Sequence, residues 1–262
     1  MEKILVSGDS WSNPKYKSRI NPEYKNVMTW SDMLKGDVTN ISINGQDNVS
    51  IINNALGSIY TNKPDRVIIA LSCWSRYSTP NYRMNPLFLF NVAVKTKLID
   101  NYEYDKKEYT RMLRHLAGMM DTTIEDVDDV YGFIIHFVKN YIPMFVYNTS
   151  LALMNIINIC DHLKIKLHIF QTFNAFSCAV DKNDNRAMFE KELISSNLFL
   201  DLWDSNADLI GYPWIPNAGG FTADSILNRE EDILGKGDGH PNQNGHRKIG
   251  EWFNASYTDY KI

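Results

Sequence analysis

A continuous apolar run in the first third of the chain limits the folds that it can adopt. The segment 65–74 reads DRVIIALSCW, and no polar residue interrupts it between 67 and 71. Strands with one solvated face alternate polar and apolar residues, whereas a continuous run is typical of a strand buried on both faces of a parallel sheet. Such a sheet needs helices on both sides, so the run indicates an α/β fold.

Shorter elements alternate around this run. We expect further strands at 3–7, 37–45 and 166–173, and helices at 27–36, 47–60, 185–196 and 243–256. Strands and helices therefore alternate from the first residues onward, which predicts a doubly wound, mostly parallel sheet. The expected fold class is a three-layer α/β/α sandwich of the flavodoxin-like kind. The segment 201–237 is rich in Gly and Pro, and we expect it to be mostly loop.

The middle of the chain departs from this alternation. Helical periodicity covers 105–120 and 130–163, with Pro143 as a kink or a first-turn residue. This stretch is too long for one ordinary crossover helix. We therefore expect a helical insertion at about 86–163, which includes the crossover helix at its end. No repeat or linker is apparent, so 1–262 is predicted to be a single domain.

Composition excludes some classes of function. The net charge of −4 gives no basic footprint for nucleic acid. No apolar run approaches the ~20 residues that cross a bilayer, and the amino terminus lacks a signal-peptide core. Three cysteines in no metal-type spacing suit a reduced compartment. We expect a cytoplasmic protein (in the host cytoplasm or the virion if it is viral) without a cofactor.

Polar residues follow the predicted strands at their carboxyl ends, where doubly wound folds bind ligands. The residues after the four strands are Gly8-Asp9-Ser10, Asn44-Gly45-Gln46, Ser72 to Arg76, and Thr172 to Asn174. The loop 237–241 before the last helix is expected at the same edge.

Four of these residues have the chemistry of nucleophilic catalysis. A serine hydroxyl needs a base, a group that orients the base, and donors for the oxyanion. Ser10 offers the nucleophile, His240 the base and Asp238 the orienting carboxylate. The amide of Gly45 offers an oxyanion donor, because a residue without Cβ lets the backbone approach a substrate closely.

The same residues carry a resemblance to a known family. GDSWS after the first strand, NISINGQDN after the second and DGHPNQNGH before the last helix resemble the motifs of SGNH (GDSL-type) hydrolases. The resemblance implies ester hydrolysis by a serine nucleophile on a three-layer α/β fold. It also implies that the amides of Ser10 and Gly45 bind the oxyanion.

Two departures from the family pattern stand out. The third block of the family, G-x-N-D, supplies an Asn as a third oxyanion donor, but the corresponding stretch here is 72–75, SCWS. Ser72, Ser75 or Arg76 could donate instead, and Ser or Thr followed by Arg after this strand is similar to phage-type members. The family's acid usually stands three residues before the histidine, at Gly237 here, whereas Asp238 stands two before.

The residues also allow other readings. Trp11, Trp74, Arg76 and Asn174 are candidates for the walls of a substrate cleft, although both tryptophans could be core. Asp238, His240 and His246 are residue types of a metal site, but one loop would supply all three, so we expect no metal. We interpret His246 as a surface or capping residue.

We expect a serine esterase, most plausibly one that removes a small acyl group from a carbohydrate; this substrate is implied by the resemblance. The alternative is a catalytically weak or inactive scaffold of the same fold, used as a binding or virion-associated module. The expected partner is a small ester or an acylated carbohydrate. A homo-oligomer could form through the helical insertion.

Overall fold

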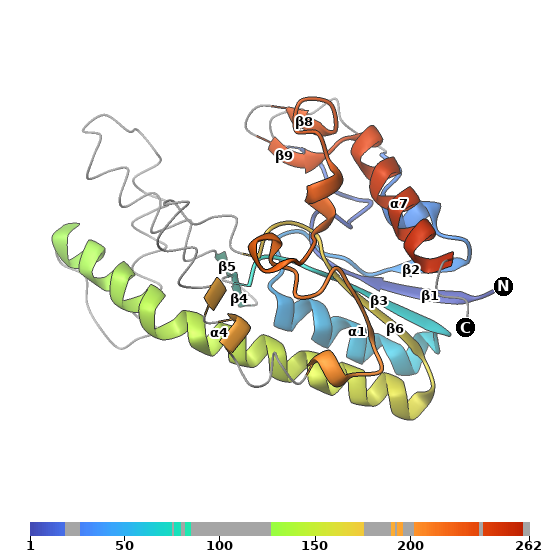
Figure 1. Ribbon diagram of the computed structural model, residues 1–262, viewed down its shortest axis with the longest axis horizontal. Coiled ribbons are helices and arrows are strands. Elements are labelled where there is room, and N and C mark those ends of the chain that lie inside the picture. The colour runs from blue at the N-terminus through green and yellow to red at the C-terminus, as the bar shows by residue number, and fades with distance from the viewer. Residues whose placement is uncertain are drawn as a thin grey trace.

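The core of the protein is a five-stranded parallel sheet. The computed structural model describes residues 1–18, 27–74, 76–79, 82–84, 127–175, 190–191, 193–195, 202–235 and 238–258. The sheet contains β1 (Lys3–Ser7), β2 (Asp37–Asn40), β3 (Arg66–Leu71), β6 (Lys166–Gln171) and β7 (Asp208–Ile210). Its strand order is β2-β1-β3-β6-β7 (Figure 1), the order of flavodoxin-like folds. The predicted fold class is confirmed.

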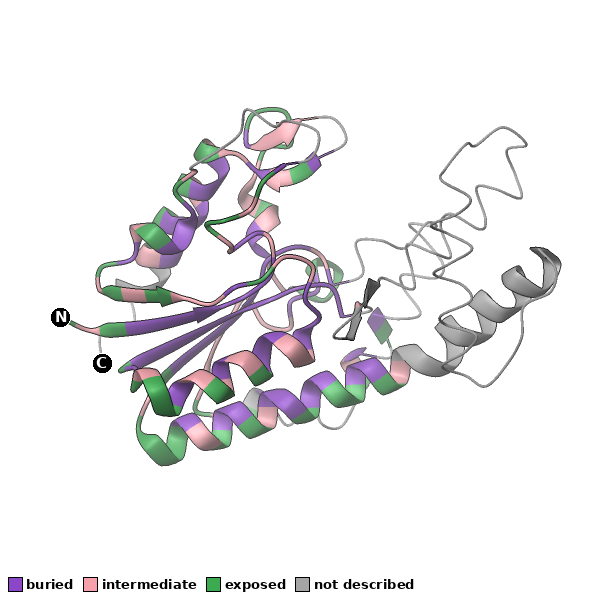
Figure 2. Ribbon diagram, turned by 180° about the vertical axis from the view of Figure 1, so that it is seen from behind, coloured by how far each residue is buried: buried purple, intermediate pink, exposed green. Residues whose placement is uncertain are grey.

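Two long helices, α1 (Asn48–Asn62) and α4 (Val127–Leu163), cover one face of the sheet (Figure 1). Ile69 of β3 and Ile169 of β6 pack in one apolar cluster with Ile52 of α1 and Ile156 of α4. Every residue of β3 is buried, and its neighbours β1 and β6 are buried except at their first residues (Figure 2). The continuous apolar run at 67–71 is explained by this burial on both faces.

The opposite face is covered by the 3-10 helix η1 (Trp30–Met33) and by α7 (Gln243–Thr258). Phe170 of β6 meets Trp30 edge-on at 5.2 Å and contacts Phe253 of α7 at 5.8 Å between ring centroids. Such aromatic pairs add about 0.5–1.5 kcal/mol beyond the burial of their area. Since α7 begins three residues after His240, this packing also fixes the position of the histidine.

The loop predicted at 201–237 is partly strand, which corrects the sequence analysis. It contains β7 at the edge of the sheet and β8 (Ile233–Gly235), which pairs antiparallel with β9 (Asp238–Pro241). Both β7 and β8 have three residues, which is too short for a periodic pattern to show.

The predicted helix at 27–36 is also wrong. Only the four residues of η1 are helical. Thr29 and Asp32 form a reciprocal capping box around this single turn, and the chain is extended again at Leu34.

The predicted helical insertion is described only in its second half. Residues 127–163 form the single helix α4, with Pro143 inside it. A hairpin of β4 (Tyr77–Thr79) and β5 (Tyr82–Met84) precedes the segment. Residues 85–126 lie outside the described residues. The insertion, the single domain and an oligomer contact there remain predictions.

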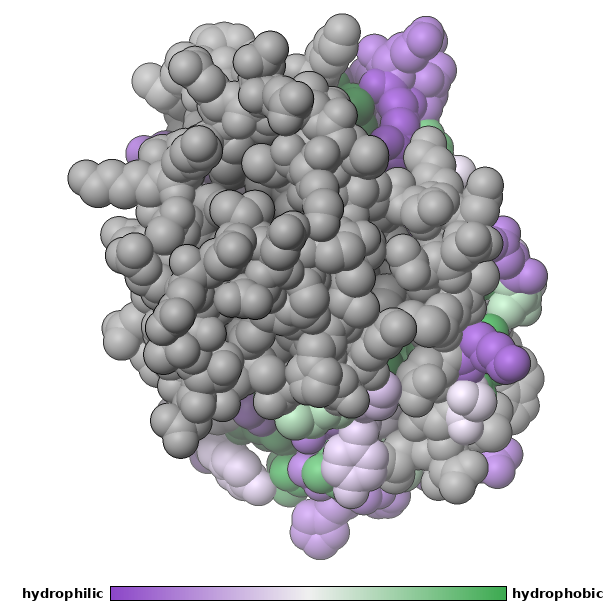
Figure 3. Space-filling model, turned by 90° about the vertical axis from the view of Figure 1, so that its left-hand side faces the viewer, coloured by the Kyte–Doolittle hydropathy of each residue, from purple (hydrophilic) through white to green (hydrophobic). Residues whose placement is uncertain are grey.

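The outer side of α4 carries exposed apolar residues between polar ones. Met144, Tyr147 and Leu151 are exposed, and so are Asn148 and Asn155. Figure 3 likewise shows apolar and polar residues intermingled along the lower edge of the molecule. Within the described ranges, no helix combines the length and the apolar character needed to cross a bilayer.

Two helical glycines provide a matched test of the packing beneath the histidine loop. A Cβ on Gly245 of α7 would lie 2.2 Å from the backbone oxygen of Asp232, whereas a Cβ on Gly57 of α1 would meet no atom within 4 Å. Gly245→Ala should lower the free energy of unfolding by at least about 1–3 kcal/mol through overpacking. Gly57→Ala should raise it by about 0.5–1 kcal/mol, because alanine is the better helix former. Urea denaturation measures both, and equal effects would contradict the packing described here.

Candidate active site

Ser10 lies in a tight turn directly after β1. The amide of Ser12 donates to the carbonyl of Asp9 at 3.1 Å, and the amide of Trp11 donates to Asp9 Oδ1 at 3.0 Å. A Cβ on Gly8 would lie only 2.7 Å from Ser12 Oγ, so a larger residue there would force the turn open. The GDS sequence therefore folds back on itself and leaves Ser10 partly exposed at the strand end.

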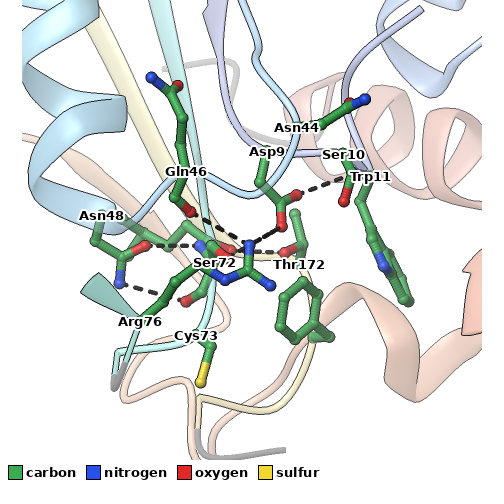
Figure 4. A network of polar contacts seen from close by, with 12 residues as sticks. Asp9, Ser10, Trp11, Asn44, Gln46, Asn48, Ser72, Cys73, Arg76 and Thr172 are labelled. Atoms are coloured by element: carbon green, nitrogen blue, oxygen red, sulfur yellow. Dashed lines mark hydrogen bonds and ion pairs between the residues drawn. The ribbon is translucent and has the colours of Figure 1, made fainter. Parts of the chain in front are cut away.

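The carboxylate of Asp9 is fully buried and ties β1 to β3 (Figure 4). Its Oδ2 accepts hydrogen bonds from Ser72 Oγ at 3.0 Å and from Arg76 Nη1 at 2.9 Å. Arg76 Nη1 also donates to the carbonyl of Gln46 at 3.3 Å. A buried carboxylate is tolerated when it is paired and hydrogen-bonded in this way. This ion pair and the hydrogen bond to Gln46 thus link the segments that follow β1, β2 and β3.

The histidine loop is anchored by a second buried carboxylate, Asp232. Its Oδ2 accepts from Lys248 Nζ and from the amide of Asn228, each at 2.7 Å, and its Oδ1 accepts from Asn244 Nδ2. Burial alone would raise the pKa of the Asp232 carboxyl, but the hydrogen bonds from Lys248 and Asn228 outweigh it and hold that pKa below its ordinary value. The hairpin β8–β9 starts from this fixed point.

The side chains of Ser10, His240 and Asp238 form one continuous hydrogen-bonded chain. Ser10 Oγ lies 2.8 Å from His240 Nε2, and His240 Nδ1 lies 2.6 Å from Asp238 Oδ1. Asp238 and His240 are two residues apart in the strand β9, so their side chains project from the same face. This explains how an acid two residues before the histidine, rather than three, reaches the imidazole.

The protonation of Asp238 determines which histidine nitrogen carries the proton. Burial alone would raise the pKa of the Asp238 carboxyl, but hydrogen bonds from Ser18 and His240 outweigh it and hold the pKa below its ordinary value. The ionised carboxylate only accepts hydrogen bonds, so His240 Nδ1 carries the proton and donates it. In the neutral imidazole with this tautomer, Nε2 is the acceptor that faces the Ser10 hydroxyl.

Ser10 and His240 open into a cavity of about 320 Å³. Its apolar wall includes Trp11 and Phe173, whose ring centroids are 5.3 Å apart. Arg76 also lines the cavity, with its guanidinium carbon 5.7 Å from the centroid of the Phe173 ring. A concave site with an apolar wall and a few convergent polar groups is the usual form of a small-molecule site.

Five of the candidate residues are not among those that line this cavity: Gly45, Ser72, Trp74, Asn174 and Asp238. Ser72 is buried, and its hydroxyl donates to Asp9 while its amide donates to Asn48. Trp74, a candidate for the cleft wall, is instead a buried core residue that donates to Gln171 Oε1 at 3.0 Å. Asn174 is half-buried and is not one of the residues that line the cavity.

Gly45 lies in the turn after β2, with a φ of 72° that favours glycine. The amide of Ile43 donates to the carbonyl of Gly8 at 3.1 Å, and Asn13 Nδ2 donates to Asn44 Oδ1 at 2.8 Å. These contacts bring the turn beside the segment that carries Ser10, and Figure 4 shows Asn44 on that side of the site.

The interpretation of His246 as a surface or capping residue is wrong. His246 is 6% exposed, and its Nδ1 has no hydrogen-bond partner among the described residues. Burial, followed by the charge of His240, lowers the pKa of His246 to about 4, so it is neutral at neutral pH. Within the part of the chain that the structure describes, no three His, Cys, Asp or Glu side chains are grouped to hold a metal ion.

Two residues of the site were missed by the sequence analysis. Tyr16 and Ser18 both donate hydrogen bonds to Asp238, more than 200 positions away in the chain. They follow Ser10 within eight residues, but no spacing rule connects a loop residue after the first strand with Asp238 before the last helix. Only the folded structure brings them together.

No family model and no curated protein matches the chain. Its fold is similar to solved esterases and lipases at low identity. These include the esterase EstA from Pseudoalteromonas sp. (14% identity, 99% of this chain and 98% of that chain, TM-score 0.44). They also include a GDSL-like lipase from Bacteroides thetaiotaomicron (9% identity, 99% of this chain and 89% of that chain, TM-score 0.46). A third is an acetylxylan esterase from Geobacillus stearothermophilus (12% identity, 97% of this chain and 93% of that chain, TM-score 0.47). At these identities and TM-scores, the similarity assigns no activity to this chain.

The pKa of Asp238 leads to a pH-dependent prediction. Asp238→Asn should lower the free energy of unfolding at neutral pH, and the difference from wild type should shrink at about pH 3. The reason is that a carboxyl whose pKa is lower in the folded state stabilises the fold above its unfolded pKa, about 3.9. This stabilisation is lost as the pH falls through the folded-state value.

Urea denaturation at the two pH values measures this difference. Asp161→Asn, at an exposed position of α4, is the matched control and should change the free energy of unfolding by less than about 0.5 kcal/mol at either pH. A difference for Asp238→Asn that is the same at both pH values would show that the hydrogen bonds do not favour the ionised carboxylate.

Proposed function

We propose that the protein is a serine hydrolase that cleaves carboxylic esters through an acyl-enzyme. The observation that carries this proposal is the hydrogen-bonded chain Ser10–His240–Asp238 at the wall of a cavity. A nucleophile within reach of a base, which is itself oriented by a third group, is the arrangement that activates a serine hydroxyl.

In the acylation step, Ser10 Oγ attacks the carbonyl carbon of the ester while its proton moves to His240 Nε2. Asp238 accepts the Nδ1 proton in a hydrogen bond and stabilises the imidazolium that results. The tetrahedral intermediate then collapses, the C–O bond to the alcohol breaks, and His240 returns the proton to the leaving oxygen. The products of this step are the free alcohol and the acyl-Ser10 ester.

In the deacylation step, His240 takes a proton from water, and the resulting hydroxide attacks the acyl carbon. The carboxylic acid leaves, and the proton returns to Ser10. In both steps we assign the oxyanion to the amides of Ser10 and Gly45. The Ser72 hydroxyl already donates to Asp9, so Ser72 would act as a third oxyanion donor only after that hydrogen bond breaks. Preorganised donors of this kind are each worth about 2.7–4 kcal/mol of barrier in related chemistry.

The proposed substrate is a small acyl ester of a carbohydrate, such as an acetylated sugar. Trp11 and Phe173 would form the apolar wall against which the substrate packs. Within the described residues, Arg76 donates only from Nη1, to Asp9 and Gln46, so its other nitrogens would be the donors to a substrate oxygen in the cavity. These three residues therefore would position the ester relative to Ser10.

A second candidate is a scaffold of the same fold that binds a ligand without turnover. One observation favours it. Trp74 and Ser72, in the stretch where SGNH hydrolases carry the third donor, are both engaged in buried hydrogen bonds. Turnover of a simple ester distinguishes the two candidates.

We predict that the protein hydrolyses acetyl esters and that Ser10→Ala lowers kcat/KM by at least about a thousandfold. Asp238→Asn should have a smaller effect, but still at least about tenfold, or ~1.4 kcal/mol of transition-state stabilisation. The acid acts on the base rather than on the substrate, and the oxyanion donors retain part of the rate. Kinetics on a panel of acetyl esters, from 4-nitrophenyl acetate to acetylated sugars, measures these effects.

Two controls accompany the kinetic measurements on this panel. Excess EDTA should leave the rate unchanged, because the proposed chemistry uses no metal. Ser225→Ala is a matched substitution of an exposed serine and should keep the wild-type rate. No turnover of any ester by the wild-type protein would favour the binding scaffold, and turnover by Ser10→Ala at the wild-type rate would exclude Ser10 as the nucleophile.

A further inference from the structure

The segment that follows the nucleophile returns to the other side of the site and contacts the acid. Tyr16 Oη donates to Asp238 Oδ2 at 3.1 Å, with a longer contact of 3.4 Å to Oδ1. Ser18 Oγ donates to the same Oδ2. Ser18 and Asp238 are both buried. The nucleophile and the acid are therefore connected through residues 11–18, in addition to their connection through His240.

The ring of Tyr16 lies on the imidazole of His240. The ring centroids are 4.0 Å apart, and the planes are inclined by 22°. This stacked position restricts rotation of the imidazole. It also places the face of a phenol ring against the group that becomes positively charged when Ser10 loses its proton, and cations are attracted to such faces.

The two oxygens of Asp238 have different main partners, although Tyr16 also makes the longer contact to Oδ1. Oδ1 accepts from the amide of His240 at 3.2 Å and from Nδ1 at 2.6 Å, while Oδ2 accepts from Tyr16 and Ser18. The hydroxyls on Oδ2 thus oppose rotation of the carboxylate about its Cβ–Cγ bond. This keeps Oδ1 aligned with the imidazole nitrogen.

Tyr16 and Ser18 do not belong to the cavity lining. A substitution at either position therefore leaves the residues that contact a substrate in place. Among the described contacts, those of Tyr16 and Ser18 with Asp238 and His240 are the ones that connect them to the proton-transfer groups.

We propose that Tyr16 and Ser18 are positioning residues that clamp the Asp238–His240 pair in the geometry required for proton transfer. This inference rests on the proposed function and adds to it two residues that the chain supplies from the segment after the nucleophile. Small misplacements of catalytic groups can cost about a hundredfold in rate, so a clamp on both members of the pair has a measurable role.

The test is a double-mutant cycle on turnover of 4-nitrophenyl acetate. Tyr16→Phe keeps the ring and removes the hydroxyl, and Ser18→Ala removes the other hydroxyl. Each should lower kcat by about three- to tenfold, with KM within about twofold of wild type, since neither residue meets the substrate. Tyr16→Leu removes the ring as well and should lower kcat further than Tyr16→Phe does.

The decisive arm repeats these substitutions in the Asp238→Asn background. If the hydroxyls act through the carboxylate, Tyr16→Phe and Ser18→Ala should there cost less than about twofold. A purely structural role would give the same fold-change in both backgrounds. Tyr60→Phe, at an exposed position of α1, is the matched tyrosine control and should leave kcat unchanged. Far-UV circular dichroism and melting curves confirm that each variant is folded.

The outcomes separate this inference from the proposed function. Ser10→Ala at wild-type rate, or a wild-type protein without turnover, would overturn the proposed function and the clamp with it. If Ser10→Ala is inactive but Tyr16→Phe and Ser18→Ala cost the same fold-change in kcat in the wild-type and Asp238→Asn backgrounds, the clamp alone would be overturned. Loss of both effects in the Asp238→Asn background supports both.

Discussion

The buried ion pair between Asp9 and Arg76 is the contact on which the geometry of the site depends. Asp9 is fully buried at the end of β1, and its only charge partner among the described residues is Arg76, beyond the end of β3. A buried carboxylate without its partner would be strongly destabilising. The pairing therefore constrains the turn that presents Ser10, the residue directly after Asp9, relative to the neighbouring strand ends. The parallel sheet brings these ends to one edge, and the ion pair fixes them there.

His240 reaches the same edge of the sheet by an independent route. Asp232 anchors the start of the β8–β9 hairpin, and the packing of α7 on the sheet fixes its end. Between these two anchors, β9 is extended, so Asp238 and His240 point in the same direction. Tyr16 then connects the two halves of the site, because it comes from the segment after Ser10 and contacts both members of the acid–base pair. The site is thus held by buried carboxylates at both ends and by an aromatic contact between them.

The sequence allowed prediction of the elements that have a long or continuous pattern. The buried strand β3, the helix α1 and the helix α7 were all expected close to their observed bounds. The short strands β7 and β8 were not, because three residues carry no periodicity. For the site, Ser10, His240 and Asp238 could be identified because motif spacing and strand order place them at one edge. Tyr16 and Ser18 could not, since their role arises from a loop path that no local pattern determines. Burial of Trp74 and His246 likewise depends on tertiary packing.

The central claim is that His240 activates Ser10 as a nucleophile, and covalent labelling tests it without knowledge of the substrate. A fluorophosphonate reacts with activated serine hydroxyls by forming an O–P bond with loss of fluoride. Mass spectrometry of the digested protein should locate one adduct, on Ser10, and His240→Ala should slow labelling by at least about a hundredfold. No adduct on Ser10 in the folded wild-type protein, or labelling at an equal rate in His240→Ala, would contradict the claim.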